Sequence, residues 1–257
     1  MNLLFTICAR AGSKGVRGKN LRNFLEWPII YYTLSTYQIF VEKHGVDYQS
    51  ISLAINTDSK ELIEQVKKTN IEYISIPRQA DLAGDVISKT DVIKDTVNQA
   101  EILLDRKFEI IIDLDVTSPL RTIADIKGVL DTLICDQKAD VSFSVTDSRR
   151  LPYFNMVCEN SDGYYGVLIP RGYVSRQQAP RCYDMNASIY AYRREFILCE
   201  TTFSVFDGNA VVWKMLDTAV LDIDNEEDFE LMEVLAKYFY GKYSSYQEIY
   251  KGICSVI

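Results

Sequence analysis

The stretch from Ile7 to Asn20, ICARAGSKGVRGKN, holds three glycines, two lysines and two arginines and no acidic residue. It follows an apolar run, LLFTIC, that is typical of a strand buried in a parallel sheet. Glycines let backbone N–H groups approach a ligand closely, and the cationic side chains add positive charge. A solvated basic loop would explain the charges but not the three glycines. The stretch therefore predicts a phosphate site, suited to a triphosphate.

Two common phosphate-binding patterns do not fit this loop. A Walker A loop needs a glycine five residues before the Gly18-Lys19 pair and a hydroxyl residue after it, but these positions hold Ser13 and Asn20. The dinucleotide pattern GxGxxG fails as well, because the glycines are spaced three apart. What remains is a loop defined by its glycines and by its cations, which are Arg10, Lys14, Arg17, Lys19 and Arg22.

A second group with chemical potential is the pair Asp222 and Asp224 in the run LDID. Residues two apart in an extended segment project to the same face, so both carboxylates face one ligand. They form either a site for a hard cation or a strand end that caps the next helix. Asn225 and Asp228 can begin that helix without help from either aspartate. The metal site is the better interpretation.

Other kinds of catalysis have little support. The only histidine, His44, lies in the polar stretch EKHGVDYQS, which is interpreted as a solvated loop with a structural role. Chemistry based on a Ser-His or Cys-His pair is therefore disfavoured. Six cysteines lie far apart without a CxxC pair, which predicts reduced thiols buried as small apolar residues rather than zinc ligands or disulfides.

Composition narrows the class of protein further. The chain has 257 residues, 47% of them hydrophobic, which is enough to bury a substantial core. A formal net charge of −8 argues against non-specific nucleic-acid binding. The apolar runs are short and the first residues lack a signal-peptide pattern, so we expect a cytoplasmic protein without membrane insertion.

Short apolar runs alternate with helical patterns over the first 145 residues. Strands are expected at 3–8, 51–55, 71–76, 108–114 and 139–145. Helices are expected at about 28–41, from Asp58 with Glu61 as its capping partner, and around an apolar stripe at 126, 129, 130, 133 and 134. This alternation predicts a doubly wound α/β fold with a mostly parallel sheet and ligands at the carboxyl ends of the strands.

The alternation stops near residue 146. Residues 146–185 are rich in turn formers, include an Asp162-Gly163 hairpin turn, and are expected to form a small inserted subdomain. A strand at 186–192, another near 210–214 and a final helix from Asn225 to about Tyr240 return to the main body. The chain is thus expected to be one domain, 1–257, with one insertion.

Five segments carry a family resemblance that spans nearly the whole chain. ARAGSKGVRGKN, RQADLAGD, TSPLRT, RQQAPRCYDMNASIY and DIDNEEDF occur in order and at suitable separations. Together they resemble the CMP-sialic acid synthetases, the cytidylyltransferases that activate nine-carbon acidic sugars. The resemblance implies a nucleotide-diphospho-sugar transferase-like fold and a homodimer in which the inserted subdomain reaches the partner's active site. In that arrangement Arg176 or the Arg149-Arg150 pair serves the sugar carboxylate of the neighbouring subunit.

The resemblance also implies a reaction. The anomeric hydroxyl of a 2-keto-3-deoxy sugar acid attacks the α-phosphate of CTP with Mg²⁺, giving a CMP-sugar and pyrophosphate. Arg10 and Lys19 would stabilise phosphate charge, Asp222 and Asp224 would hold the metal, and Asp222 or a metal-bound hydroxide would take the proton. The nucleotide-binding positions carried over are Arg10, Ala11, Gly12, Ser13, Lys14, Lys19, Asn20, Arg78, Ala83 and Gly84.

The sugar-binding positions are also implied by the resemblance, with one departure. Many sialate members have glutamine-proline before TSPLR, whereas this chain has DLDVTSPLRT, so Asp115 stands in the place of the glutamine. Asp115 either contacts sugar or ribose, adds a carboxylate near the metal together with Asp113, or belongs to a loop network. The positions carried over are Asp115, Thr117, Ser118, Arg121, Arg176, Gln177, Tyr183 and Asn186.

The choice of sugar acid rests on where the chain leaves the sialate pattern. Asp184 and Met185 precede NASIY, where sialate members tend to show arginine and proline. This segment resembles the bacterial branch that activates legionaminic acid. Met185, Tyr153 and Phe154 would cover the terminal methyl of that sugar; the alternative is that they form the core of the inserted subdomain.

Two other functions stay open at the level of sequence. A nucleotide-sugar glycosyltransferase also has an α/β nucleotide domain and a DxD metal pair, for which DLD at 113–115 could be mistaken. A non-catalytic nucleotide-binding relative is the other, because fold alone does not establish activity. The cationic loop argues against the first, and the joint presence of Arg10, Lys19, Asp222 and Asp224 argues against the second.

Overall fold

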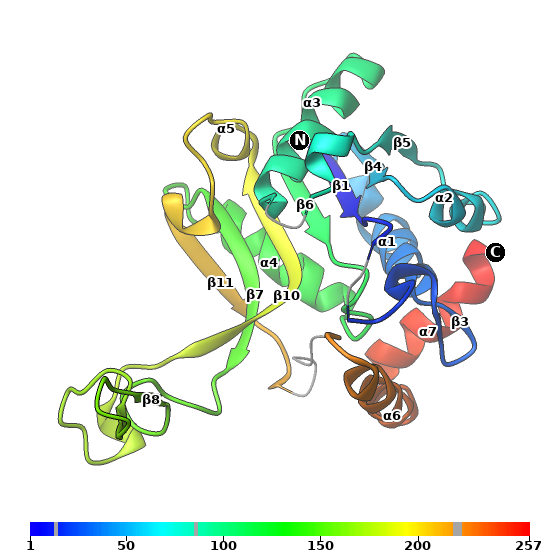
Figure 1. Ribbon diagram of the computed structural model, residues 1–257. Helices are drawn as coiled ribbons and strands as arrows, with labels where there is room; N and C mark the ends of the chain where they lie inside the picture. The colour runs from blue at the N-terminus through cyan, green and yellow to red at the C-terminus, as the bar shows by residue number, and fades with distance from the viewer. Residues whose placement is uncertain (13–14, 85–86, 218–222) are drawn as a thin grey trace.

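The centre of the molecule is a seven-stranded sheet in the order β11-β7-β10-β6-β1-β4-β5 (Figure 1). The computed structural model describes residues 1–12, 15–84, 87–217 and 223–257. Strand β10 runs antiparallel to β6 and β7, and the other neighbouring strands pair in parallel. The strands are β1 (Asn2–Cys8), β4 (Ser50–Thr57), β5 (Ile74–Pro77), β6 (Ile110–Leu114), β7 (Val141–Asp147), β10 (Tyr183–Arg193) and β11 (Ala210–Lys214).

Helices cover both faces of this sheet. Alternate residues of β1 enter two separate cores, with Leu3 and Phe5 on one side and Leu4 on the other. The first core also takes side chains from α1, α2, α4, α6 and α7, and the second from α3 and α5. The helices are α1 (Ile29–His44), α2 (Lys60–Val66), α3 (Lys89–Leu104), α4 (Ile123–Cys135), α5 (Arg194–Ile197), α6 (Glu226–Lys242) and α7 (Ser244–Val256). The prediction of a doubly wound, mostly parallel α/β fold is confirmed.

Capping residues in the sequence predicted the start of one helix correctly and that of another one residue too early. Asn225 caps α6 and Asp228 completes the capping box, as the sequence predicted. Helix α2, however, is capped by Ser59 rather than Asp58, because the Ser59 hydroxyl accepts from the backbone N–H of Leu62 at 3.1 Å. Helix α3 was not predicted from the sequence.

Some expectations about the body are wrong. The helix from Asn225 is not the last one, since α7 follows it and packs beside α1 (Figure 1). His44 is the last residue of α1 rather than part of a loop. Ile134, the last member of the predicted stripe, is exposed. The cysteines are free as expected but not buried, because Cys135, Cys158, Cys199 and Cys254 are exposed.

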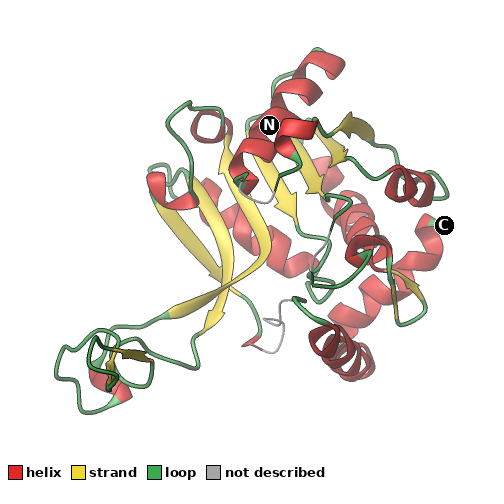
Figure 2. Ribbon diagram, in the orientation of Figure 1, coloured by secondary structure: helices red, strands yellow, loops and turns green. Residues whose placement is uncertain are grey.

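The segment between β7 and β10 projects away from the sheet (Figure 2). We call residues 148–182 the arm. It contains a two-stranded hairpin, β8 (Val157–Glu159) and β9 (Tyr165–Val167), whose turn includes Gly163 with a positive φ of 81°. The predicted Asp162-Gly163 turn is thus confirmed. Most of the arm is exposed.

The remaining elements are short. They include the β2 (Asn23–Phe24) and β3 (Trp27–Pro28) hairpin and the 3₁₀ turns η1 (Lys19–Leu21), η2 (Gly45–Asp47), η3 (Ala80–Leu82), η4 (Arg176–Gln178) and η5 (Val205–Asp207). Of the helices the structure describes, none combines the length and apolar character needed to span a membrane.

Candidate active site

A cavity of about 330 Å³ opens where the parallel strands β1, β5 and β6 end. Ligands of open α/β sheets bind at this edge. The cavity brings together predicted positions from three distant segments: the loop after β1, the segment after β5 and the segment after β6. Its lining residues are Cys8, Arg10, Lys19, Asn20, Arg78, Leu82, Gly84, Ile87, Lys89, Val92, Asp115 and Thr117.

The loop after β1, residues 9–21, is the predicted phosphate loop. The Asp58 carboxylate accepts a hydrogen bond from the backbone N–H of Ala11 at 2.7 Å. The side chain of Asn20 donates to the Arg10 carbonyl at 3.1 Å, which ties the two ends of the loop together. Ala11 and Gly12 are exposed. The predicted residues Ser13 and Lys14 lie outside the described part of the chain.

The phosphate loop touches the segment that carries the predicted metal ligands. The Lys19 ammonium donates to the Ile223 carbonyl at 2.6 Å. Gly15 lies so close to Asp224 that a Cβ at position 15 would overlap the Asp224 carbonyl oxygen. Asp224 itself is exposed, while Asp222 lies outside the described residues. Two regions about 200 residues apart in the sequence thus meet at one point.

The predicted nucleotide-binding positions Arg78, Ala83 and Gly84 follow β5. The Arg78 guanidinium donates to the Asn56 side-chain oxygen at 2.8 Å and to the Asn56 carbonyl at 3.3 Å, so the end of β4 fixes its orientation. Turn η3 then leads to Ala83 and Gly84, of which Gly84 lines the cavity. Arg78 is half-buried at the cavity wall.

Lys89 is a cavity residue that sequence reasoning missed. Its ammonium lies 2.8 Å from an Asp113 carboxylate oxygen and 3.0 Å from an Asp115 carboxylate oxygen. Burial alone would lower the pKa of Lys89, but the two carboxylates outweigh burial and hold that pKa well above its ordinary value. Lys89 is the first residue of α3, and no local pattern tied it to the strand end 24 residues later.

Asp113, on β6, and Asp115, just after it, already have partners. The Thr6 hydroxyl donates to buried Asp113 at 2.8 Å. The backbone N–H and hydroxyl of Thr117 donate to Asp115 at 2.9 and 2.8 Å. Burial would raise the pKa of Asp115, yet the Lys89 charge and the Thr117 bonds lower it well below its usual range. Asp115 is therefore an ionised member of a loop network, which was one of the alternatives drawn from the sequence.

Arg121 was expected to contact the sugar, but its position in the structure does not allow this. It is fully buried, and its guanidinium donates to the backbone carbonyls of Ser118, Ser188 and Asp115. Burial lowers the pKa of Arg121 to about 10, against the opposing effect of Asp115. Arg121 is thus occupied with shaping the 115–121 loop and has no exposed surface to offer a sugar. Ser118 is also buried.

The other predicted sugar positions do not line this cavity in the described structure. Arg176 and Gln177 lie in η4 on the arm, where the Arg176 guanidinium donates to the Arg149 carbonyl at 2.6 Å. Tyr183 begins β10 and is exposed. Asn186 is buried, and its side-chain oxygen accepts from the Ser144 hydroxyl at 2.6 Å.

Two of the three apolar residues assigned to the sugar tail are not part of a packed core. Phe154 is 43% and Met185 37% exposed. Tyr153 is half-buried and meets Tyr173 edge-to-face at 5.8 Å between ring centroids. The alternative that Phe154 and Met185 form a packed core is therefore wrong. Both side chains are open to contacts from outside this chain or from a ligand.

A magnesium ion can be accommodated next to the phosphate loop. Among the described residues no group of three or more His, Cys, Asp or Glu side chains could hold a metal. Mg²⁺ needs no such group, because it usually binds one or two carboxylates together with substrate phosphates and water. Asp224, exposed and in contact with the loop, has the right chemistry for this role.

Comparisons with known proteins show which family this chain resembles. Residues 4–242 match the family model described as Cytidylyltransferase. A Campylobacter coli protein named post-translational flagellin modification protein B is 37% identical over 91% of this chain and 95% of its own length. The CMP-N,N'-diacetyllegionaminic acid synthase of Campylobacter jejuni is 36% identical over 91% of this chain and 94% of its own length.

One solved structure supports the fold prediction. CMP:2-keto-3-deoxy-manno-octonic acid synthetase, complexed with CTP, is similar with a TM-score of 0.60 and 18% identity over 93% of this chain and 99% of that chain. At this identity the likeness concerns the fold alone. It confirms the nucleotide-diphospho-sugar transferase-like architecture expected from the sequence.

Proposed function

Because the chain belongs to the cytidylyltransferase family and is therefore a nucleotidyltransferase, we propose that its substrates are CTP and a nine-carbon 2-keto-3-deoxy sugar acid. The observation that supports this most is the contact between Lys19 and the Ile223 carbonyl. It brings a loop rich in cations and glycines to the segment that carries the predicted metal carboxylates. A triphosphate in the cavity would meet both at once.

In the proposed reaction the anomeric hydroxyl of the sugar acid attacks the α-phosphate of CTP, and pyrophosphate leaves. Arg10 and Lys19 are the cations of the cavity wall suited to charge that builds up on the phosphates. Asp224, with Asp222, would hold Mg²⁺. When bound, that ion would neutralise phosphate charge and orient the α-phosphate. Positioning by the loop supplies much of the remaining catalysis, because phosphoryl transfer depends on alignment.

Selection of cytosine is assigned to Arg78 and to the backbone around Ala83 and Gly84. Asn56 holds the Arg78 guanidinium in one orientation, which favours a fixed contact with a base edge. Uracil would leave buried polar groups unpaired, at a cost of about 1 to 3 kcal/mol for each group. CTP should therefore be preferred over UTP.

The sugar acid proposed is of the legionaminic type. A relative that shares 36% of its residues with this chain is named for the CMP-activated form of diacetyllegionaminic acid. The exposed Phe154 and Met185 offer apolar contact for a terminal methyl group, whereas a glycerol tail would leave its last hydroxyl unpaired against them.

We further propose that the enzyme is a homodimer formed through the arm. Large apolar side chains stay exposed along it, including Val157, Tyr164, Tyr165 and Val174. In a dimer they would be covered, and Arg176 could serve the partner's cavity. Light scattering should give twice the chain mass, and a monomer with full activity would contradict this proposal.

The substrate proposal is tested by measuring pyrophosphate release. The protein with Mg²⁺ is offered CTP, UTP, ATP or GTP, each with N-acetylneuraminic, diacetyllegionaminic, pseudaminic or 3-deoxy-manno-octulosonic acid. We expect release with CTP only and the highest kcat/KM with diacetyllegionaminic acid. No turnover with any of these acids would defeat the proposal. A more than tenfold preference for N-acetylneuraminic acid would defeat only the legionaminic assignment.

A further inference from the structure

The contacts between the phosphate loop and the Ile223-Asp224 segment continue well beyond the cavity. Arg22, just after the loop, forms an ion pair with Glu226 and lies over the Phe229 ring at 4.2 Å from its centroid. Farther on, the backbone N–H of Leu25 donates to the Glu233 carboxylate at 2.6 Å. Residues 15–25 are thus held in register along residues 223–233. We call the contacts made by Arg22, Leu25, Glu226, Phe229 and Glu233 the clasp.

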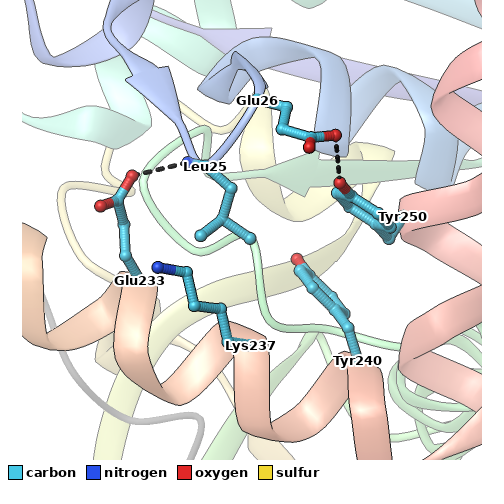
Figure 3. Close-up of a pocket in the computed structure, with 6 residues that line it drawn as sticks. All are labelled: Leu25, Glu26, Glu233, Lys237, Tyr240 and Tyr250. Atoms are coloured by element: carbon cyan, nitrogen blue, oxygen red, sulfur yellow. Dashed lines mark hydrogen bonds between the residues drawn. The ribbon is translucent and has the colours of Figure 1, made fainter.

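The far end of the clasp holds the β2–β3 hairpin tip in an unusual conformation (Figure 3). Leu25 has a φ of 55°, a left-handed conformation that a leucine rarely adopts. Glu233 from α6 holds its N–H, and the Tyr250 hydroxyl from α7 donates to Glu26 at 2.6 Å. Such backbone persists only where neighbouring contacts impose it. The tip is therefore fixed by two helices from the other end of the chain.

The polar contacts of the clasp are not needed to dock α6. Phe229 is buried and meets the buried Phe24 ring edge-to-face at 5.8 Å between centroids, which already fastens the helix to the hairpin. The Arg22 and Glu226 side chains are 35% and 53% exposed, and ion pairs with such exposure add little stability. The polar contacts instead set the alignment of the two segments. Arg22 is paired with Glu226, and Leu25 with Glu233.

Register matters here because both segments begin at the active site. Residues 22–25 follow directly after the phosphate loop, and α6 follows directly after Asp224. A shift of α6 along the hairpin would move Asp224 relative to the loop that holds the phosphates. Misplacement of reacting groups by about 1 Å can cost on the order of 100-fold in rate.

We propose that Arg22 and Glu233 are positioning residues that hold the phosphate loop in register with Asp224, so that phosphate and metal are bound together. This inference rests on the proposed function, since it assigns the two residues a task in the binding of CTP with Mg²⁺. Neither residue is among those that line the cavity.

The test compares Arg22→Ala and Glu233→Ala with two matched controls. Glu233→Gln keeps an oxygen that can accept from Leu25. Lys237→Ala changes an exposed residue one turn farther along α6, which lines the same small pocket beside the hairpin tip as Leu25 and Glu233 (Figure 3). For each variant, CTP affinity is measured by calorimetry with EDTA and with Mg²⁺, together with kcat and the unfolding midpoint. Wild-type protein should bind CTP more tightly with Mg²⁺.

We expect both alanine variants to bind metal-free CTP within about threefold of wild type, because the loop itself is intact. The tightening by Mg²⁺ should shrink by about tenfold and kcat should fall by about 10- to 100-fold. Glu233→Gln and Lys237→Ala should match wild type within about twofold. This split separates positioning from a merely structural role.

Unchanged Mg²⁺ tightening and unchanged kcat in both alanine variants would overturn the proposal. Equal losses in Glu233→Gln or Lys237→Ala, or losses that simply follow the unfolding midpoint, would overturn it too. A wild-type protein that binds CTP with Mg²⁺ but turns over no sugar acid would defeat the substrate proposal alone. The calorimetric comparison among the variants would then still test whether Arg22 and Glu233 are positioning residues.

Discussion

The chain contains two Asp-x-Asp segments at the ends of extended runs, and the structure treats them in opposite ways. In 113–115 both carboxylates are paired with Lys89 and also accept from threonine. In 222–224 the described residue, Asp224, is exposed and adjoins the phosphate loop. The same spacing therefore gives carboxylates paired with a protein cation at one place and a candidate ligand for a metal cation at the other.

The difference follows from burial. Asp113 stands on the central strand β6, where an unpaired carboxylate would be costly, and the Lys89 ammonium supplies its partner. Asp224 precedes α6 and is exposed, so water can solvate its charge. A glycosyltransferase that bound its metal through DLD would need these carboxylates free, and here Lys89 occupies them.

The largest expected effect comes from removing the accessible carboxylate. Asp224→Asn should lower kcat by more than about 1000-fold, because loss of metal binding costs several kcal/mol of transition-state stabilisation. CTP binding should survive in part, since the loop cations are intact. Steady-state kinetics with calorimetry would measure both quantities. Full activity in this variant would show that Asp224 has no role in the mechanism. The proposed difference between segments 113–115 and 222–224 would then be wrong.

The next effect is on stability and concerns the occupied segment. Lys89→Met should lower the free energy of unfolding at pH 7 by about 2 to 3 kcal/mol, because two carboxylates lose their shared cation. The value lies below that of a fully buried pair because a third of the Lys89 side chain is exposed. Urea unfolding would measure it. A loss below about 0.5 kcal/mol would mean that water and the hydrogen bonds from Thr117 stabilise the Asp115 carboxylate well enough without Lys89.

The same variant has a pH signature. The folded pKa of Asp115 lies well below its unfolded value, so its stabilising effect is complete above the unfolded pKa of about 4 and is lost as pH falls through the folded pKa. The stability difference between wild type and Lys89→Met should hence be constant from pH 6 to 8 and shrink below about pH 4. A difference that grows on acidification would contradict this assignment of charge.

The smallest effect is expected at Asp115, one of the two carboxylates that pair with Lys89. Asp115→Asn should lower kcat by less than about tenfold, because the amide oxygen can still accept from Thr117 and Lys89 still pairs with Asp113. Compared with Asp224→Asn under the same conditions, it measures how unequal the two segments are. A loss as large as that of Asp224→Asn would make Asp115 part of the reacting centre.

Within the site, residue type and spacing predicted some features and not others. The phosphate loop was visible because three glycines and an unbroken set of cations at a strand end are a local pattern. The buried role of Arg121 was not visible, because its three carbonyl partners come from two separate segments. Lys89 was missed for the same reason.

The sequence by itself determined the class of fold, most strands, the Asn225-Asp228 capping box and the family, because these depend on short-range periodicity, capping and motif order. Tertiary structure alone decided that Lys89 pairs with both Asp113 and Asp115 and that Arg22 pairs with Glu226. It also decided that Met185 and Phe154 stay exposed. These outcomes depend on which distant segments meet at one strand end, and a charged side chain is buried or exposed according to the partners it finds there.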